Sequence, residues 1–240
     1  MLEPSFLTWL RSTTEARWAD TALTGAASGL GGPAWQPGTR WRGGLTASDL
    51  DIVEAMFEIR LPAAYREFLC ALHTPDPPLA GTEVRGSQLV RVERRLFTDW
   101  SGATTPVLAA LERPVDGLLR MVALGRWHSA WGEPPADERG RGLRVRRLAA
   151  AAPRLIPLAG QRYLVAAPGC DDGPVIAVHG ADVAVVAPDL RSGLLRELGL
   201  VDPGRAAAVE PAGQLPERIP FWSDVIDGLH WAPVGAVARS

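Results

Sequence analysis

The sequence contains no lysine and no asparagine, and all 25 of its basic residues are arginine. Without lysine the chain has no amine for Schiff-base chemistry and no phosphate-loop lysine. Protein-kinase chemistry would lack both its ATP-pairing lysine and its metal-binding asparagine, and a Ser-x-x-Lys acyl-enzyme is excluded. Lysine and asparagine codons are rich in A, so their absence indicates a gene from a GC-rich, bacterial genome.

Cysteine and long apolar runs are also scarce. Two cysteines, Cys70 and Cys170, are too few for a disulfide framework. No apolar run approaches the roughly 18 residues of a membrane span, and the first residues, with Glu3 before a short apolar run, do not resemble a signal peptide. We therefore expect a cytoplasmic protein with no membrane partner. A net charge of −2 and a pI near 6.1 give no electrostatic reason to expect nucleic acid as a partner.

Residues 45–73 predict two helices that fold back on each other across an elbow at Pro62. Apolar residues recur at helical spacing in both halves, and Pro62 suits the first position of the second helix. The polar side of that helix is expected to carry His73. Two pairs could satisfy the free N–H groups of the first helix: Thr46 with Asp49, or Ser48 with Asp51. We interpret this hairpin as part of a hydrophobic core.

The segments around this hairpin carry weaker patterns. Residues 1–40 are interpreted as an apolar turn and a Gly/Ala-rich linker, an arm held to the domain by Trp9, Trp18, Trp35 and Trp41. The segments that follow the hairpin are predicted as a Pro-rich loop (74–81), a strand or short helix left undecided (89–97), a helix ended by Pro114 (105–111) and a strand (118–124).

The second half of the chain predicts an arginine-rich helix over 136–152, followed by an antiparallel meander. Its four short strands are expected at 155–158, 162–166, 174–178 and 183–187, because only tight turn sequences separate them. A helix over 189–200 and a short terminal helix within 219–231 complete the pattern.

Two stretches are candidates for contact with a partner. Trp127, His128 and Trp131 crowd into the segment 125–135, where they form either an ordinary buried aromatic loop or the lip of a binding surface. Asp171 and Asp172 lie in a turn-like sequence, where aspartate commonly just makes the turn. We take these five residues as the predicted partner-binding site.

The hairpin sequence resembles the Smi/Knr-type proteins of the SUKH superfamily. The positions that match their typical phrase are Phe57, Ile59, Leu61, Pro62, Tyr65, Phe68 and Leu69. The usual glycine before the elbow is Glu58 here, so the turn is expected to be made differently. Further phrases resemble an actinobacterial branch of the family: Phe97-x-Asp99-Trp100, Trp127-x-x-x-Trp131-Gly132, Pro153-x-Leu155-Ile156-Pro157 with Arg162-Tyr163, Pro174-Val175-x-x-Val178, and 182–190. Val186, Ala187 and Gly193-Leu194 depart from its aromatic positions.

The resemblance implies an α+β fold in which the N-terminal helical hairpin packs on a mostly antiparallel sheet. It implies a SUKH-like domain over 41–200, between an N-terminal arm (1–40) and a C-terminal extension (201–240) that docks on the domain. It also implies a protein without enzymatic activity or cofactor that binds another protein. Bacterial members include toxin-immunity proteins, and fungal members regulate cell-wall assembly.

Two rival functions remain open. Cys70 and His73, three residues apart on one helix, could pair as nucleophile and base of an enzyme of unrecognised class. The four histidines, His73, His128, His179 and His230, are scattered, so a metal site would have to be composed from distant loops. The arginines at 139–147 could meet phosphates, but they are typical of a solvated helix face.

Overall fold

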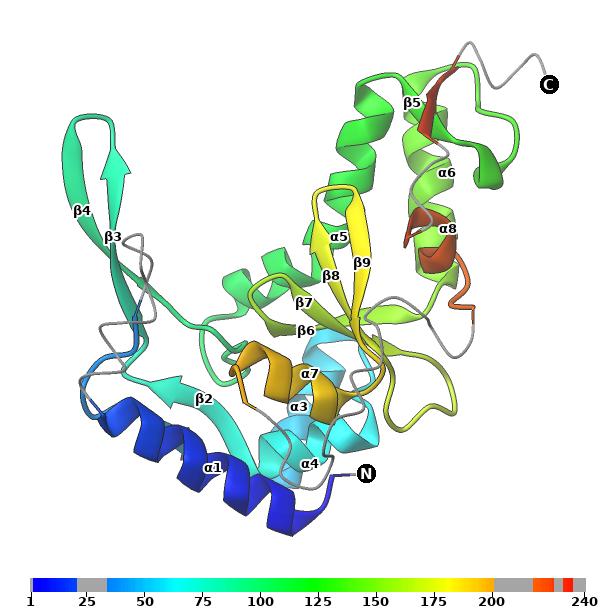
Figure 1. Ribbon diagram of the computed structural model, residues 1–240. Coiled ribbons are helices and arrows are strands. Elements are labelled where there is room, and N and C mark those ends of the chain that lie inside the picture. Colours follow the sequence, from blue (N-terminus) through cyan, green and yellow to red (C-terminus); the bar gives the residue numbers. More distant parts are fainter. Residues whose placement is uncertain (1, 21–33, 201–217, 227–230, 235–240) are drawn as a thin grey trace. The chain divides into compact units, whose positions relative to one another are not determined.

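The computed structural model describes residues 2–20, 34–200, 218–226 and 231–234. Its contacts divide the chain into two compact units, unit 1 (Met1–Thr104) and unit 2 (Thr105–Ser240), which Figure 1 shows in sequence colours. Helices and small antiparallel sheets share the described residues, which confirms the α+β class. The SUKH-like assignment and the limits 1–40, 41–200 and 201–240 stay predictions. No helix in the described ranges is long and apolar enough to cross a membrane.

Unit 1 begins with a helix where an apolar turn had been predicted. Helix α1 spans Pro4–Ala19 and buries Phe6, Leu7, Leu10 and Trp18. Leu7, Leu10, the buried Thr14 and Trp18 recur every three or four positions, so the helix has one buried face along its length. Its Trp18 lies 4.4 Å from Trp35 and 5.5 Å from Trp41 between ring centroids. The predicted glycine-rich linker falls largely on 21–33, outside the described residues.

The predicted helical hairpin is confirmed as α3 (Ala47–Phe57) and α4 (Ala63–Ala71). Thr46 and Asp49 form the capping box, and Pro62 is the N-cap of α4, one position earlier than predicted. Glu58 adopts the left-handed conformation at φ 51° that a glycine would favour. The expectation of a turn different from that of the family stays a prediction. The buried carboxylate of Glu54 holds the elbow by accepting the Leu61 N–H at 2.7 Å.

The core of unit 1 is rich in aromatic residues. Phe68 of α4 lies within 6 Å of Trp41, Tyr65 and Phe97 between ring centroids. Trp41 belongs to strand β1 (Arg40–Gly43), and its indole N–H donates to Thr14 of α1 at 2.7 Å. The hairpin, the first strand and α1 therefore share one core.

Strands follow α4 at once, where helix and loop had been predicted. Strand β2 (Leu72–Asp76) pairs antiparallel with β1, and strand β3 (Leu79–Arg85) pairs with β4 (Gln88–Arg94). His73 consequently lies in a strand and is buried, not on the polar side of a helix. The loop prediction for 74–81 was wrong, and the undecided segment 89–97 is mostly strand.

Unit 2 opens with α5, a single helix over Thr104–Ala123. The sequence had predicted that Pro114 ends this helix and that a strand follows, and both predictions were wrong. Pro114 lies inside the helix and is buried. Leu118 and Val122, one turn apart, are fully buried on the same side, so core packing outweighs the local cost of the proline.

The predicted meander is confirmed as one antiparallel sheet, ordered β6-β7-β8-β9. Its strands span Arg154–Ala159, Arg162–Ala166, Val175–His179 and Asp182–Ala187. On one face, Tyr163 donates its hydroxyl to the Ala110 carbonyl of α5 at 3.1 Å. A Cβ on Gly117 would lie 1.9 Å from the Gly180 carbonyl oxygen, so α5 approaches the β8–β9 turn as closely as a backbone can.

The remaining elements of unit 2 cover this sheet. Helix α7 (Leu190–Glu197) packs on the other face, where its Gly193 meets Val175. The predicted arginine-rich helix is confirmed as α6 (Glu138–Ala151), and the terminal helix as α8 (Trp222–Ile226). Between α5 and α6 lie β5 (Arg126–His128), which pairs with β10 (Trp231–Pro233), and a short 3-10 turn, η1 (Ser129–Trp131).

Candidate functional site

Among the described residues of unit 1, the most exposed large apolar side chains lie at the tip of the β3–β4 hairpin. Val84 and Leu89 face each other directly across the two strands. They are 73% and 76% exposed, although both belong to regular secondary structure. Other side chains normally pack against a cross-strand apolar pair and shield it from solvent. Here we find no such packing in the described part of the chain, so the pair presents its apolar surface to solvent.

The hairpin itself is a two-stranded ribbon that projects beyond the helices of unit 1 (Figure 1). Its seven-residue strands pair in register from Leu79 and Arg94 at the base to Arg85 and Gln88 at the tip. Among the described residues, the only further backbone pairing is a single bridge from Ala34 to Ala80 near the base. Over most of both outer edges, the backbone N–H and C=O groups therefore have no strand of the described residues beside them.

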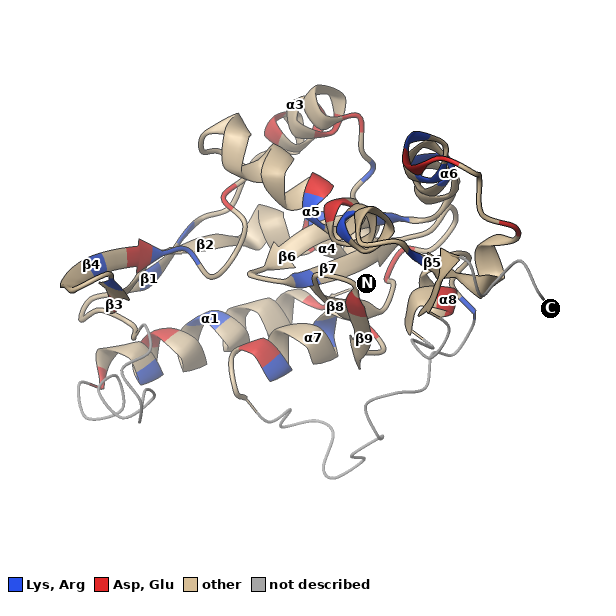
Figure 2. Cartoon of the chain, turned by 90° about the horizontal axis from the view of Figure 1, so that it is seen from above, with Lys and Arg blue, Asp and Glu red and all other residues tan. Residues whose placement is uncertain are grey.

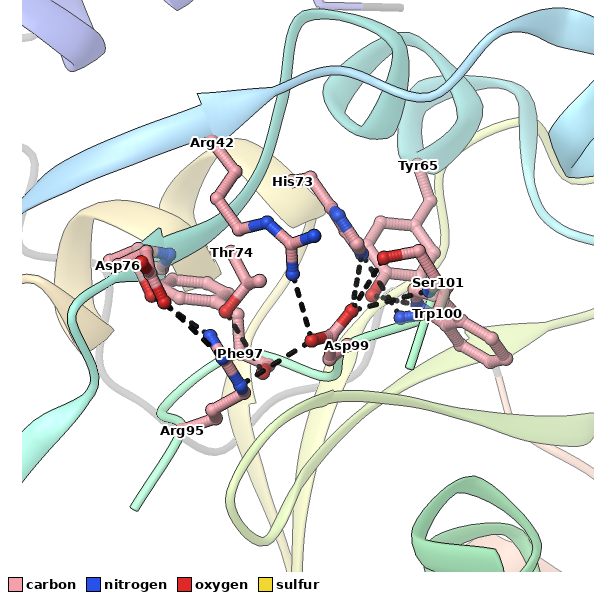
Figure 3. A network of polar contacts seen from close by, with 11 residues as sticks. Arg42, Tyr65, His73, Thr74, Asp76, Arg95, Phe97, Asp99, Trp100 and Ser101 are labelled. Carbon is pink, nitrogen blue, oxygen red and sulfur yellow. Dashed lines mark hydrogen bonds and ion pairs between the residues drawn. The ribbon is translucent and has the colours of Figure 1, made fainter. Parts of the chain in front are cut away.

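A network of polar side chains lies at the base of the hairpin, and we call it the clamp (Figure 3). Its members come from β1, β2 and the segment that follows β4: Arg42, His73, Asp76, Arg95, Asp99 and Ser101. The segments that enter and leave the hairpin meet here, because β2 leads into the hairpin and Arg95 directly follows it. The clamp therefore connects the base of the β3–β4 hairpin to the rest of unit 1.

Asp99 is the centre of the clamp. Its Oδ2 lies 3.0 Å from Nη1 of Arg42 and 3.4 Å from Nε of Arg95. Its Oδ1 accepts the backbone N–H of Ser101 at 3.2 Å and the Ser101 hydroxyl at 2.9 Å. Burial alone would raise the pKa of Asp99. The Ser101 hydrogen bond and the neighbouring positive charges outweigh burial, and the pKa is lowered.

Arg95 ties the hairpin to β2. Besides Asp99, its guanidinium reaches the carboxylate of Asp76 at 3.2 Å and the Pro75 carbonyl at 3.4 Å. These acceptors lie at the end of β2, three residues before β3 begins. One arginine thus holds the chain on both sides of the hairpin, which fixes the direction in which the ribbon leaves unit 1.

His73 is the buried member of the clamp, with 1% of its surface exposed. Its Nε2 accepts the backbone N–H of Trp100 at 3.0 Å, so that nitrogen carries no proton and the neutral ring is protonated at Nδ1. Burial lowers the pKa of His73, and the charges of Arg42 and Arg95 lower it further against the opposing effect of Asp99. His73 is therefore neutral near pH 7 and serves as an acceptor.

The groups of the clamp are already engaged with one another. The Ser101 hydroxyl donates to a carboxylate and not to a histidine, and the histidine nitrogen nearest to it is occupied by a backbone N–H. This arrangement differs from a serine nucleophile with its base. No group of three or more metal-ligating side chains comes together within the described ranges. What the clamp can do is hold the base of the hairpin in one conformation.

The structure separates the residues of the predicted partner site. Trp127, His128 and Trp131 are 0%, 0% and 3% exposed, inside the core of unit 2. The rings therefore do not form the exposed lip that was one of their two interpretations. They pack as a buried aromatic loop, because β10 and α8 bring Trp231 and Phe221 within 5.5 Å of Trp131.

The two aspartates of that predicted site lie in the turn between β7 and β8. Asp171 is exposed, whereas Oδ1 of Asp172 accepts the backbone N–H of Leu190 at 2.9 Å at the start of α7. Asp172 therefore helps to cap a helix, as aspartate in a turn often does. A binding role for these aspartates stays a prediction.

The residues of the enzyme hypothesis also occupy different elements. Cys70 is an exposed thiol on α4, and His73 is buried in β2 and bonded to Trp100. The helix that was to place them on one side ends at Ala71, between the two. The hypothesis of an enzyme built on this pair stays a prediction without the helical geometry on which it was based.

Sequence reasoning missed the hairpin and its clamp. A signal was present, because the two-residue Gly86-Ser87 turn separates two stretches of alternating character. The Phe97-x-Asp99-Trp100 phrase was noted for its resemblance to a family, but its role in the clamp depends on contacts between residues more than 20 positions apart. Comparisons of the chain with protein-family models, curated proteins and solved structures found no match.

Proposed function

We propose that this chain is a protein-interaction module without enzymatic activity, and that it presents the β3–β4 hairpin to a protein partner. The observation that carries the proposal is the Val84–Leu89 pair, which is 73% and 76% exposed at the tip of a paired ribbon. Apolar side chains on a protruding element, flanked by charged neighbours, are typical of a protein contact.

The edges of the hairpin support the same proposal. A two-stranded ribbon is marginally stable in water, and free strand edges readily pair with a strand of another protein. The clamp lowers the entropic cost of such binding, because the base of the ribbon is already held by Arg95 and Asp99 before the partner arrives. A partner would therefore meet a pre-organised surface.

The resemblance of the α3–α4 sequence to Smi/Knr-type proteins points to two biological settings. The chain would act either as a bacterial toxin-immunity protein or as a regulator related to the cell wall, in both cases by covering a surface of its partner. Neither setting requires the chain to turn over a substrate, and neither requires a cofactor.

Affinity capture with matched variants tests this proposal. The wild-type chain is compared with a Val84→Ser/Leu89→Ser variant, which removes the apolar tip but keeps the strands. The control, Leu108→Ser/Leu124→Ser, removes two exposed leucines of unit 2, which are 47% and 75% exposed. We expect quantitative mass spectrometry to find a protein that the wild type and the control retain, and that the tip variant loses by about tenfold or more.

Two results would contradict the proposal. One is a protein retained equally by the wild type and the tip variant, because the tip would then contribute nothing to binding. The other is the absence of any protein retained at a stoichiometry comparable to that of the bait, both in resting and in stressed cells. Circular dichroism of both variants confirms beforehand that each is folded.

A further inference from the structure

A second surface lies in unit 2, in a groove of about 730 Å³ between α5 and α6. Each helix contributes residues at helical spacing, so the groove follows matching faces of the two helices. The apolar side chains in it include Leu119 and Val122 of α5 and Leu143 of α6, and Leu143 is 56% exposed. Leu119 and Leu143 give the groove an apolar centre that solvent reaches, whereas Val122 lies buried beneath them.

Arginines line the same groove. Arg120 comes from α5, and Arg139 and Arg146 come from α6, two turns apart. No carboxylate of the described residues pairs with any of the three. From Arg139 to Arg154 the chain has six arginines and no acidic residue, and the arginine positions on the α6 ribbon are coloured blue in Figure 2. The groove therefore combines an apolar centre with three arginines that form no ion pair among the described residues.

We propose that this groove binds an acidic, amphipathic helical segment of a protein partner. The apolar side chains of such a segment would cover Leu119 and Leu143. Its carboxylates would meet the arginine side chains, which offer paired N–H donors for this purpose. This inference does not rest on the proposed hairpin contact, because the groove belongs to unit 2 and the hairpin to unit 1.

Two features of the groove favour a protein segment over nucleic acid. Asp116 and Glu138 also line it, and their carboxylates would repel a phosphate backbone while leaving room for a ligand of mixed charge. No aromatic side chain is among the residues that line the groove, so bases would find no ring on which to stack. An apolar centre serves a helix with leucines better than it serves a sugar-phosphate chain.

A direct test uses the full chain and a labelled peptide. The probe is a fluorescein-labelled amphipathic peptide of about 14 residues, the length of α6, with leucine at every third or fourth position and glutamate on both flanks. Its twin carries lysine in place of glutamate, and a third probe is a duplex DNA of similar length to the peptide. Fluorescence anisotropy is measured at low and at physiological salt.

We expect the acidic peptide to bind and the basic twin and the DNA to bind at least about fivefold more weakly. The charge-reversal variant Arg139→Glu/Arg146→Glu should weaken binding of the acidic peptide about tenfold and should gain affinity for the basic twin. The matched control is Arg144→Glu/Arg147→Glu, which changes the charge of the same helix equally at residues that do not line the groove. That control should weaken binding by less than about threefold.

Three results would overturn the inference. Equal loss in both charge-reversal variants would show that the attraction comes from the overall charge of α6 and not from the groove. Stronger binding of the duplex DNA would assign the arginines to nucleic acid. Failure of the acidic peptide to bind, or equal binding of its basic twin, would mean that the groove does not select acidic segments. None of these results bears on the hairpin proposal, whose variants lie in unit 1.

Discussion

Two stretches of this chain differ in how far their apolar side chains are exposed to solvent. The segment 125–135 contributes Trp127 and Trp131, both nearly inaccessible to solvent, to the core of unit 2. The β3–β4 hairpin has an ordinary, arginine-rich sequence, yet it leaves Val84 and Leu89 largely exposed. Aromatic richness in the sequence thus marks the core here, and the apolar surface available to a partner lies where the sequence is less conspicuous.

The two stretches differ in how many other elements of the fold pack around them. The Trp131 ring stacks on Phe221 and meets Trp127 and Trp231 edge-on, so that helices and strands from several parts of unit 2 enclose it. The hairpin is a two-stranded sheet, and beyond its base no further strand of the described residues pairs with it. A ribbon of this kind cannot bury the side chains of both faces by itself.

The largest expected effect is from Trp127→Ala. The ring is 0% exposed and its N–H donates to the Gly132 carbonyl at 2.7 Å, so its loss leaves a cavity and an unpaired carbonyl. We expect the free energy of unfolding to fall by about 3–5 kcal/mol, measured by urea denaturation followed by circular dichroism. Leu124→Ala, three residues away and 75% exposed, is the control and should change it by less than about 0.5 kcal/mol. A loss below about 1 kcal/mol for Trp127→Ala would place the ring at the surface.

A smaller loss is expected when the clamp is opened. Asp99→Ala removes the acceptor of both Ser101 hydrogen bonds and leaves Arg42 and Arg95 without their shared carboxylate. We expect about 2 kcal/mol of destabilisation by the same measurement. Asp51→Ala is the matched control, because that carboxylate also pairs with an arginine at 2.8 Å but is 69% exposed. If both variants lost the same amount, the clamp would be no more than a surface ion pair.

Acid should weaken the clamp through His73. Burial holds the pKa of His73 below the roughly 6.5 of an exposed histidine. Below about pH 6.5 the histidine of the unfolded chain is therefore protonated at pH values at which His73 of the folded chain is still neutral. Its effect on stability is therefore absent above about pH 6.5 and grows as the pH falls below that value. Asp99, whose pKa is also lowered, adds a further loss at more acidic pH, below the pKa of an ordinary aspartate.

The His73→Gln variant isolates this effect, because a glutamine oxygen can still accept the Trp100 N–H. Denaturation midpoints at pH 7 and pH 5 should differ less for His73→Gln than for the wild type. An equal pH difference in the wild type and in His73→Gln would mean that folding does not lower the pKa of His73.

The smallest expected effect on stability is at the tip itself. Val84→Ser/Leu89→Ser should change the free energy of unfolding by less than about 0.5 kcal/mol, since both side chains are already exposed to water in the folded chain. The measurement is again urea denaturation at pH 7. A loss above about 2 kcal/mol would mean that the tip is covered by another part of the chain, and the contrast with Trp127 would disappear.

Local patterns in the sequence were sufficient for the elements whose signals are local. The Thr46–Asp49 capping box, the two helices across the elbow and the four-stranded meander follow from spacing and turn residues within short windows. The strand predicted at 118–124 failed, because Pro114 looked like a helix end and only core packing of Leu118 and Val122 keeps the helix intact. Rules based on neighbouring residues include the helix-breaking effect of proline but not the stabilisation from core packing.

The candidate site could not be predicted for a related reason. His73 and Trp100 are 27 positions apart, and Arg42 and Asp99 are 57 apart, so nothing in either neighbourhood reveals the clamp. The exposure of Val84 and Leu89 depends equally on what the rest of the chain leaves uncovered. Alternation and the Gly86-Ser87 turn could have suggested a hairpin, but not that its tip would be open to solvent.

Site-specific photocrosslinking in the cells from which the gene comes is the most direct test of the hairpin as a binding surface. A benzophenone amino acid replaces Leu89 in one version of the full chain and the equally exposed Leu124 in another. We expect irradiation to attach one protein to the chain labelled at position 89, and not to the chain labelled at 124. If position 89 gives no adduct, or if both positions give the same set of adducts, the hairpin is not the surface that binds a partner.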